Sequence, residues 1–404
     1  MINLEIPKKF RPLVSQANQV ATEVFRPISR KYDEAEHEYP KELDMLASLI
    51  DGMNEGSDIG GAGAAGVRRE SNDNGDGGNR NGSNLSTVLG IVELCWGDVG
   101  LLLSMPRQGL GNSAIASVAT EEQLERYGGK WAAMAITEPE AGSDSASIRT
   151  TAELDGDEYV LNGEKIFVTS GDRADLIVVW ASLDRDKGRA AIKSFIVERD
   201  NPGLKLDRLE HKLGIRASDT ANFTLHDCRV PKEALLGSPE IDTKAGFGGA
   251  MQTFDNTRPL VAAMAVGVTR AALEETRRCL EEAGVEIDDA VPAFSQHAAA
   301  ARLLEMEADY EAARLLTMQA AWMADNAKPN SLQASMAKAK AGRTCVDVTL
   351  GCVELCGSVG YDENSLLEKW ARDAKILDIF EGTQQIQLLI VARQLLSKSS
   401  SELR

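Results

Sequence analysis

The 404-residue sequence lacks an excess of positive charge and any long apolar run. Only 44 Lys and Arg residues stand against 62 Asp and Glu residues, which gives a formal net charge of −18. This balance excludes an extended footprint for nucleic acid or for an anionic membrane. No window approaches the apolar length of a membrane span, and the first ten residues contain no apolar core of signal-peptide length. The composition therefore predicts a cytoplasmic protein without a membrane span.

Metal-ligating motifs are also missing. The six cysteines are scattered, and their one close pair, Cys352 and Cys356, lies in a helical pattern without metal-ligating partners. Buried free thiols in a reducing compartment are the expected state of these residues. The sequence predicts no metal site.

Residues 51–86 have too few apolar side chains to form a core. They are rich in Gly, Asn, Asp and Ser, a composition that predicts a mobile segment. A phosphate-binding glycine loop is the alternative, but no strand precedes the segment and no Gly-Lys-Ser/Thr ends it.

The remaining patterns predict three regions in order. Apolar residues recur at helical spacing over 10–50 and 88–117, and Thr120-Glu-Glu-Gln123 has the form of a capping box. Alternation over 159–168 predicts a strand, and Asn162-Gly163 within it is a hairpin signal. Further strands are predicted at 176–180, 192–197 and 223–225.

The C-terminal third is helical in pattern. Long amphipathic stretches cover 257–283, 296–327 and 331–355, with Ser331 as a plausible cap, and short breaks between them predict a four-helix bundle. The fold class is therefore α+β. The predicted domains are an N-terminal α-helical domain (1–132), a β-domain (133–233) and a C-terminal bundle (234–404).

A lone carboxylate near the C-terminus, Glu381, is the main candidate for chemistry. Phe380 precedes it, Gly382 follows it, and Thr383 is placed to cap a helix with an apolar side of Ile386, Leu389, Ile390 and Leu395. Poor hydration raises the pKa of a carboxyl group and suits it to act as a general base near neutral pH. The alternative is an acidic residue favoured near a helix start by the helix dipole.

The stretch Phe380-Glu-Gly-Thr-Gln-Gln-Ile-Gln387, with Trp370-Ala-Arg-Asp-Ala-Lys375 upstream, resembles the C-terminal signature of the acyl-CoA dehydrogenases, medium-chain-like members among them. The resemblance implies that Glu381 removes the α-proton of an acyl thioester. It also implies an N-terminal helical domain, a β-domain and a C-terminal four-helix bundle, with FAD at their junction.

Other stretches resemble the same family in the same order. Met134-Ala-Ile-Thr-Glu-Pro-Glu-Ala-Gly-Ser-Asp144 is similar to the family's flavin loop, although Glu140 stands where Gly is common. Asn162–Gly171 resembles the strand that packs an aromatic residue on the flavin. Both stretches also fit ordinary turn and strand residues. The resemblance implies flavin contacts from Met134, Ile136, Thr137, Ser143, Phe167, Thr169, Thr383 and Gln385.

Phe254-Asp-Asn-Thr-Arg-Pro259 resembles the segment that faces coenzyme A in this family, although a charged residue beside Pro is common at helix starts. The implied substrate contacts are Ser143, Asp255, Arg258 and Gly382.

The implied activity is FAD-dependent α,β-dehydrogenation of an acyl-CoA, with electrons passed to an electron-transfer flavoprotein. Two alternatives stay open: an acyl-CoA oxidase, and a non-catalytic subunit of a mixed oligomer. The sequence does not define the acyl chain.

Two segments depart from the family pattern. Residues 281–291 lack the arginine that reaches a neighbouring subunit's FAD in homotetrameric members, and carry acidic residues instead. Residues 354–358 lack the usual Gln-x-Phe-Gly-Gly. The chain is therefore expected in a tetramer that is possibly mixed with a related subunit.

Overall fold

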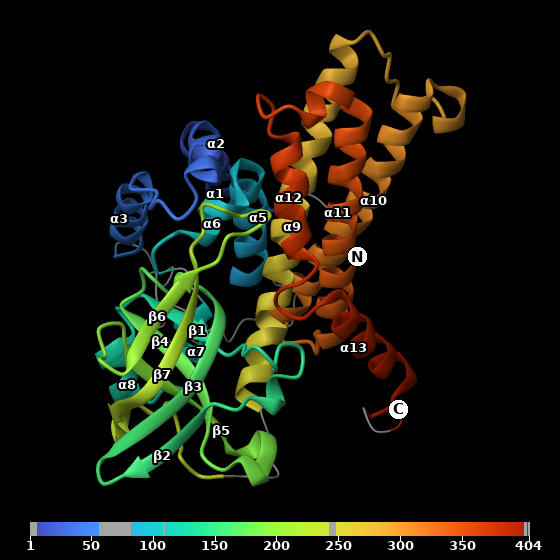
Figure 1. Ribbon diagram of the computed structural model, residues 1–404. Helices are drawn as coiled ribbons and strands as arrows, with labels where there is room; N and C mark the ends of the chain where they lie inside the picture. The colour runs from blue at the N-terminus through green and yellow to red at the C-terminus, as the bar shows by residue number, and fades with distance from the viewer. Residues whose placement is uncertain (1–5, 56–81, 108–109, 242–247, 400–401, 403–404) are drawn as a thin grey trace.

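The computed structural model describes residues 6–55, 82–107, 110–241, 248–399 and 402. Along these residues the chain forms helices, then a seven-stranded sheet, then long helices that stand beside the sheet (Figure 1). The predicted α+β class is confirmed. None of the helices in these ranges is long and apolar enough to cross a membrane.

Short helices make up the N-terminal region. They are α1 (Arg11–Val20), α2 (Arg26–Ala35), α3 (Glu42–Glu55), α5 (Ser83–Gly97), α6 (Val99–Leu103), α7 (Leu110–Val118) and α8 (Glu121–Tyr127), with a π-helical turn, Ala21–Phe25, between α1 and α2. The capping box predicted at Thr120 is confirmed: its Oγ1 accepts from the Gln123 N–H, and Gln123 Oε1 accepts from the Thr120 N–H.

The segment predicted to be mobile, 51–86, begins and ends in helix. Residues 51–55 belong to α3 and 83–86 belong to α5, so the flanking helices extend further than expected, and the mobility of the segment stays a prediction. Residues 56–81 lie outside the described part of the chain. The helices on either side, α3 and α5, extend into the segment despite its low apolar content.

The sheet contains β1 (Ala132–Ala135), β2 (Thr151–Asp155), β3 (Glu158–Thr169), β4 (Leu176–Ser182), β5 (Ile192–Glu198), β6 (Leu204–Leu209) and β7 (Thr220–Pro231). Its order is β1-β4-β2-β3-β7-β6, and β5 pairs with β4. The four predicted strands correspond to β3, β4, β5 and β7. The strands β1, β2 and β6 were missed, because each is short and lacks a strong alternation.

The predicted hairpin at Asn162-Gly163 was wrong. Both residues lie inside β3, where the pairing with β7 shifts register between Leu161 and Gly163. A Cβ at Gly163 would lie 2.4 Å from Thr150 Oγ1, so a close strand contact explains this glycine. The turn between β2 and β3 instead contains Gly156, whose φ is 66°.

The C-terminal region contains α9 (Gly248–Glu282), α10 (Ala298–Asp325), α11 (Ser331–Tyr361), α12 (Leu367–Leu377) and α13 (Gln384–Leu396). Helices α9 to α12 lie side by side as a bundle (Figure 1). Ser331 is the first residue of α11 rather than its cap; Asn330 precedes it without a side-chain capping bond. The bundle core is built largely from alanines and valines of α9 and α11.

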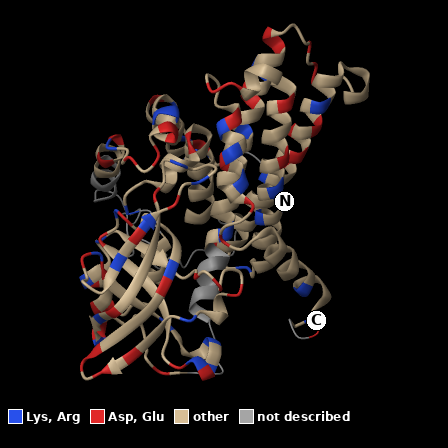
Figure 2. Cartoon of the chain, viewed as in Figure 1, with Lys and Arg blue, Asp and Glu red and all other residues tan. Residues whose placement is uncertain are grey.

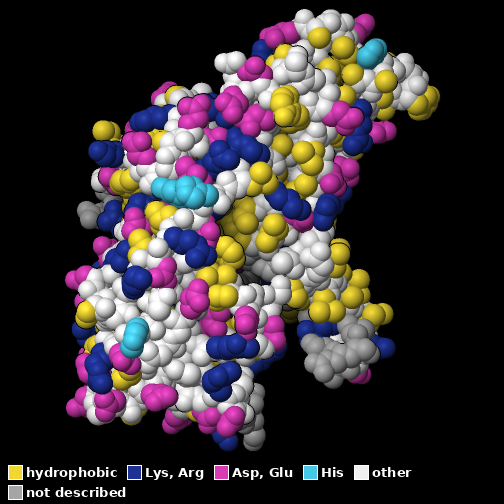
Figure 3. All heavy atoms as spheres, viewed as in Figure 1, with side chains coloured by type: hydrophobic (Ala, Val, Ile, Leu, Met, Phe, Trp, Pro, Cys, Tyr) yellow, Lys and Arg dark blue, Asp and Glu magenta, His cyan; other side chains and the backbone are white. Residues whose placement is uncertain are grey.

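Helix α13 extends away from the bundle with little of its surface covered. Thr383 caps it as predicted, with its Oγ1 accepting from the Ile386 N–H at 3.4 Å. The predicted apolar side is only partly covered: Ile386 and Ile390 are half-buried, whereas Leu389 and Leu395 are exposed, as are Leu388 and Leu396. Yellow apolar side chains are visible over this helix in Figure 3.

Acidic and basic side chains are interspersed over the bundle and the sheet in the view of Figure 2. One ion cluster is buried. Lys369 of α12 lies with its Nζ 2.7 Å from Asp98 Oδ2 and 2.6 Å from Asp373 Oδ2, and all three side chains are almost inaccessible to water. Asp98 precedes α6, so this cluster joins the N-terminal helices to the bundle.

Replacing this ammonium should strongly destabilise the fold. We expect Lys369→Met to lower the free energy of unfolding by about 3–5 kcal/mol, because two buried carboxylates lose their counter-charge. Equilibrium urea unfolding measures the change.

The matched control is Lys340→Met. Lys340 of α11 pairs with Asp309 at 2.6 Å, but that pair is exposed to solvent, and an exposed pair contributes about 1 kcal/mol or less. Equal losses in the two variants would contradict a special role for the buried cluster.

Candidate functional site

Glu381 lies in the tight turn between α12 and α13. Its backbone φ is 56°, and Gly382 follows with a φ of 91°. A left-handed conformation costs a non-glycine residue about 1–3 kcal/mol and tends to occur at functional sites. The buried Gln387 holds this turn, because its Nε2 donates to the carbonyl oxygens of Glu381 and Gly382 at 3.1 and 3.2 Å.

Side chains from α9 and α11 surround the Glu381 carboxylate. Thr257 Oγ1 donates to Glu381 Oε2 at 2.8 Å. Burial raises the pKa of Glu381, while this hydrogen bond and the positive charges of Arg258 and Lys338 oppose the rise. The carboxylate is therefore a stronger base than an exposed glutamate, as the sequence predicted.

Lys338 is the unusual member of this group. It is fully buried, and its Nζ has no hydrogen-bond partner among the described residues. Burial lowers its pKa to about 8, while the charges of Asp378 and Glu381 oppose the shift. Its ammonium therefore acts on Glu381 through space rather than through a direct hydrogen bond.

The predicted substrate residues lie on two elements. Arg258 is buried on α9, one residue after Thr257, and Gly382 is in the Glu381 turn. Asp255 also belongs to α9, but its side chain lies outside the described part of the structure. Thr257 and Lys338 were missed, because only the folded bundle brings α9 and α11 to the turn.

The residues predicted to contact flavin begin on β1 and the loop after it. Met134 is on β1, Ile136 and Thr137 follow, and the Ile166 N–H donates to the Thr137 carbonyl at 2.9 Å. Met134 and Ile136 pack against a small apolar cluster that includes Trp180. The loop is therefore fixed to β3.

A buried pair reinforces this connection. Lys165 Nζ lies 2.7 Å from Glu138 Oε1 and 3.2 Å from the Ile136 carbonyl oxygen. Glu138 also accepts from the Thr150 N–H at 3.0 Å. Both residues occur inside motifs quoted from the sequence, but nothing in the sequence indicated that they pair.

Phe167 and Thr169 lie at the end of β3. Phe167 has a φ of 58° at a register shift, its N–H donates to Asn222 Oδ1, and 59% of its surface is exposed. Thr169 is half-buried and pairs with Thr220 of β7. An exposed phenyl ring at a strained position is available to pack on a planar ligand.

Ser143 lies exposed in the loop after β1. The charge of Glu140 in this loop is balanced by Arg149, whose guanidinium lies 2.5 Å from the carboxylate. At the start of α13, Thr383 is half-buried and Gln385 is exposed. The buried Oε1 of the adjacent Gln384 has no partner.

These residues form two groups. One contains Glu381, Gly382 and Arg258 on the bundle; the other contains the residues of β1, β3 and their loop. Figure 1 shows the sheet, which carries the second group, beside α9, which carries Arg258. Hydroxyl donors, an exposed aromatic ring and an unpaired amide oxygen suit a planar polar cofactor such as FAD.

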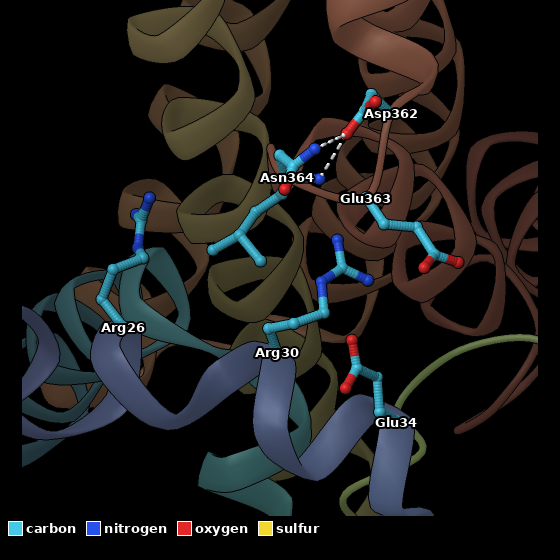
Figure 4. A pocket seen from close by; sticks show the side chains of 7 residues that line it. Arg26, Arg30, Glu34, Asp362, Glu363 and Asn364 are labelled. Atoms are coloured by element: carbon cyan, nitrogen blue, oxygen red, sulfur yellow. Dashed lines mark hydrogen bonds between the residues drawn. The ribbon is translucent and has the colours of Figure 1, made fainter.

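Another cleft lies away from these residues. It has a volume of about 700 Å³ and is lined by Arg26, Arg30 and Glu34 of α2 and by residues 362–366 (Figure 4). Arg30 is already engaged by Glu368 at 2.5 Å, and Arg26 stacks on Trp96. None of the predicted site residues lines it.

The acidic segment 281–291 is bound to its own subunit. Arg277 of α9 contacts Asp289 at 3.0 Å and Glu307 at 2.8 Å, and the Asp288 N–H donates to Gln296 Oε1. Gly357, in the second departing segment, has a φ of 55° and interrupts α11.

Two family profiles match the chain. The acyl-CoA dehydrogenase middle domain matches residues 133–228, and the acyl-CoA dehydrogenase C-terminal domain matches residues 244–396. The short-chain-specific acyl-CoA dehydrogenase of Clostridium acetobutylicum is 36% identical over 78% of this chain and 83% of its own length. The mitochondrial short-chain-specific enzyme of Bos taurus is 33% identical over 99% of this chain and 93% of its own.

Solved structures of related proteins have a similar fold. Butyryl-CoA dehydrogenase from Megasphaera elsdenii superposes with a TM-score of 0.80 at 31% identity, covering 98% of this chain and all of the other. A structure from work on the electron transferring flavoprotein of Acidaminococcus fermentans gives 0.79 at 32% identity over 98% of this chain and all of the other. The two sequence relatives are named short-chain-specific enzymes, whereas the sequence motifs had suggested medium-chain-like members of the family. The chain belongs to the acyl-CoA dehydrogenase family.

Proposed function

We propose that this protein catalyses α,β-dehydrogenation of a short-chain acyl-CoA to the 2-enoyl-CoA, with Glu381 as the base that takes the α-proton. The observation that carries this proposal is the Glu381 carboxylate itself, desolvated in a strained turn and hydrogen-bonded to Thr257. The short acyl chain rests on the names of the relatives.

Bound FAD supplies the hydride acceptor. Phe167 is proposed to pack on the flavin, with Met134, Ile136, Thr137, Ser143, Thr169, Thr383 and Gln385 as its other contacts. Asp255, Arg258, Ser143 and Gly382 are proposed to contact the acyl-CoA. The backbone N–H of Glu381 is proposed to stabilise charge that develops on the thioester oxygen.

The base needs two opposed properties. Burial favours the protonated carboxyl group, whereas the positive charges of Arg258 and Lys338 favour the ionised form that can accept a proton. Electrons are proposed to pass to an electron-transfer flavoprotein, since one structural relative comes from work on such a flavoprotein. Oxygen uptake during turnover would instead identify an oxidase.

Glu381→Gln should abolish dehydrogenation without removing FAD. We expect the rate at which butyryl-CoA bleaches the flavin to fall at least ~10²-fold, because no base accepts the α-proton. Anaerobic stopped-flow absorbance measures this rate, and the FAD content per chain reports the integrity of the site.

The control is Glu402→Gln, which changes a glutamate whose carboxylate bonds only to Ser399 in the described structure. It should bleach at the wild-type rate. Rapid bleaching in Glu381→Gln would rule out Glu381 as the base. A wild-type chain that binds FAD but is never bleached would support a non-catalytic subunit.

Lys338→Met should move the acid limb of the pH–rate profile to higher pH. The ammonium lowers the pKa of Glu381, so its removal raises that pKa further and the base is protonated over a wider pH range. We expect a shift on the order of one pH unit, measured from kcat between pH 5 and 9 in about half-unit steps.

The paired control is Lys340→Met on the same helix, where Lys340 faces solvent and pairs with Asp309. Its profile should match wild type. An unmoved profile in Lys338→Met, with normal FAD content, would show that Lys338 does not tune the base.

We also propose that the chain works in a tetramer with a related subunit. Residues 281–291 contain no Lys or Arg, and Arg277 beside them is already bound by Asp289 and Glu307. This surface offers no free cation to the pyrophosphate of a neighbouring flavin, whereas an arginine is a strong partner for phosphate. The exposed leucines of α13 provide an apolar surface for assembly.

The chain expressed alone should therefore not form a homotetramer with one FAD per subunit. Native mass spectrometry gives both the assembly and the number of flavins. A stable homotetramer, fully loaded and fully active, would contradict the mixed assembly and leave the proposed reaction intact.

A further inference from the structure

A small cluster of metal-ligating side chains contains none of the residues of the proposed active site. Glu36 and His37, in the turn after α2, meet His211 in the loop between β6 and β7. One ligand atom from each residue lies within 4.8 Å of the other two. Figure 3 shows a patch of histidine side chains, in cyan, where the N-terminal helices meet the sheet.

The cluster is already held together by short contacts. Glu36 Oε2 lies 2.8 Å from His211 Nδ1, and Glu36 Oε1 accepts from the Lys212 N–H at 3.0 Å. The two imidazole rings lie 4.9 Å apart between centroids and are inclined by 58°. Glu36 is therefore oriented by the backbone of the opposite loop, with one oxygen directed at the histidine.

His37 carries the observation that points to a ligand. Both of its ring nitrogens are buried, and neither has a hydrogen-bond partner in the part of the chain that the structure describes. Buried polar atoms are rarely left unpaired, so an unpaired imidazole next to a second imidazole and a carboxylate requires an explanation.

The backbone at this turn is also unusual. Glu36 has a φ of 31° and His37 a φ of 59°. Two consecutive non-glycine residues in this region cost energy that other interactions must offset. The hydrogen bonds of Glu36 to the opposite loop provide part of the compensation, and a shared ligand would provide more.

Two imidazole nitrogens and one carboxylate oxygen are a typical donor set for Zn²⁺ and related transition-metal dications. In a tetrahedral zinc site the donor atoms lie about 3.3 Å apart. The ligand atoms of this cluster, which lie within 4.8 Å of one another, must therefore move closer together to bind the ion. His211 is free to do this, because its side chain is 82% exposed. Mg²⁺ and Ca²⁺ prefer sites made of oxygen ligands and do not fit this set.

The charges around the cluster are compatible with a bound cation. Lys212 is the nearby positive group, but its Nζ donates to the Ser218 carbonyl at 2.8 Å. The Glu36 carboxylate supplies negative charge directly to the cluster. Water would complete the coordination on the exposed side.

We propose that Glu36, His37 and His211 form a surface site for Zn²⁺ or a similar transition-metal dication, and that the metal clamps the N-terminal helices to the sheet. The sequence indicated no metal site, because His211 is far along the chain from Glu36 and His37. The clamp is independent of the proposed dehydrogenation.

Isothermal titration of the flavin-loaded wild-type protein with ZnCl₂, after treatment with a chelator, tests the site. We expect one binding event in wild type that weakens at least ~10-fold in His37→Ala and in His211→Ala, since even an outer-sphere partner of a metal site is worth roughly 10–100-fold. ZnCl₂ should also raise the Tm of wild type but not of either variant.

The matched control is His226→Ala. His226 is 84% exposed and lies beside Asp227, but it has no second imidazole near it in the described structure. This variant should keep the binding event and the rise in Tm, and MgCl₂ should reproduce neither. Unchanged zinc binding and Tm in His211→Ala would overturn the proposal, because zinc held by thiols such as Cys279 and Cys356 would behave in that way.

Discussion

One buried ammonium group, that of Lys369, connects the three parts of this fold. It lies between Asp98, which begins α6, and Asp373, one turn further along α12. Asp98 also accepts from the Ser29 hydroxyl of α2, and Asp373 accepts from the Ile215 N–H in the loop before β7. Burial lowers the pKa of Lys369, but the two carboxylates outweigh it and raise the net pKa above its usual range. The charge therefore persists in a dry interior, where each member depends on the others.

The position of the proposed base follows from this network. Helix α12 carries Lys369 and ends at Leu377, four residues before Glu381. Arg372 of the same helix binds Asp33 at 2.6 Å and donates to the Leu213 carbonyl at 3.0 Å, so α12 is attached to both the N-terminal helices and the sheet. The Glu381 turn is thus located relative to the sheet by polar contacts one to three helical turns away. Precision at the site is obtained from rigid elements rather than from the turn alone.

Local patterns in the sequence predicted much of this architecture. The long helices, the capping box at Thr120 and the cap at Thr383 are encoded within a few residues of one another and were found. Asn162-Gly163 failed as a turn signal because a contact with Thr150, made only in the sheet, decides its conformation. The leucines of α13 failed as a core signal because periodicity identifies an apolar face but not what covers it.

The same distinction explains what was predicted of the site. Glu381 and its raised pKa could be predicted from the neighbouring residues in the sequence, Phe380 and Gly382. The roles of Thr257 and Lys338 could not be predicted, because each residue lies in an ordinary helical pattern. Each acts on Glu381 only because its helix packs against the turn. Burial raises the pKa of the Glu381 carboxyl group, whereas the Thr257 hydrogen bond and the positive charges of Arg258 and Lys338 lower it. The basicity of Glu381 therefore depends on contacts that α9, α11 and the turn after α12 make together.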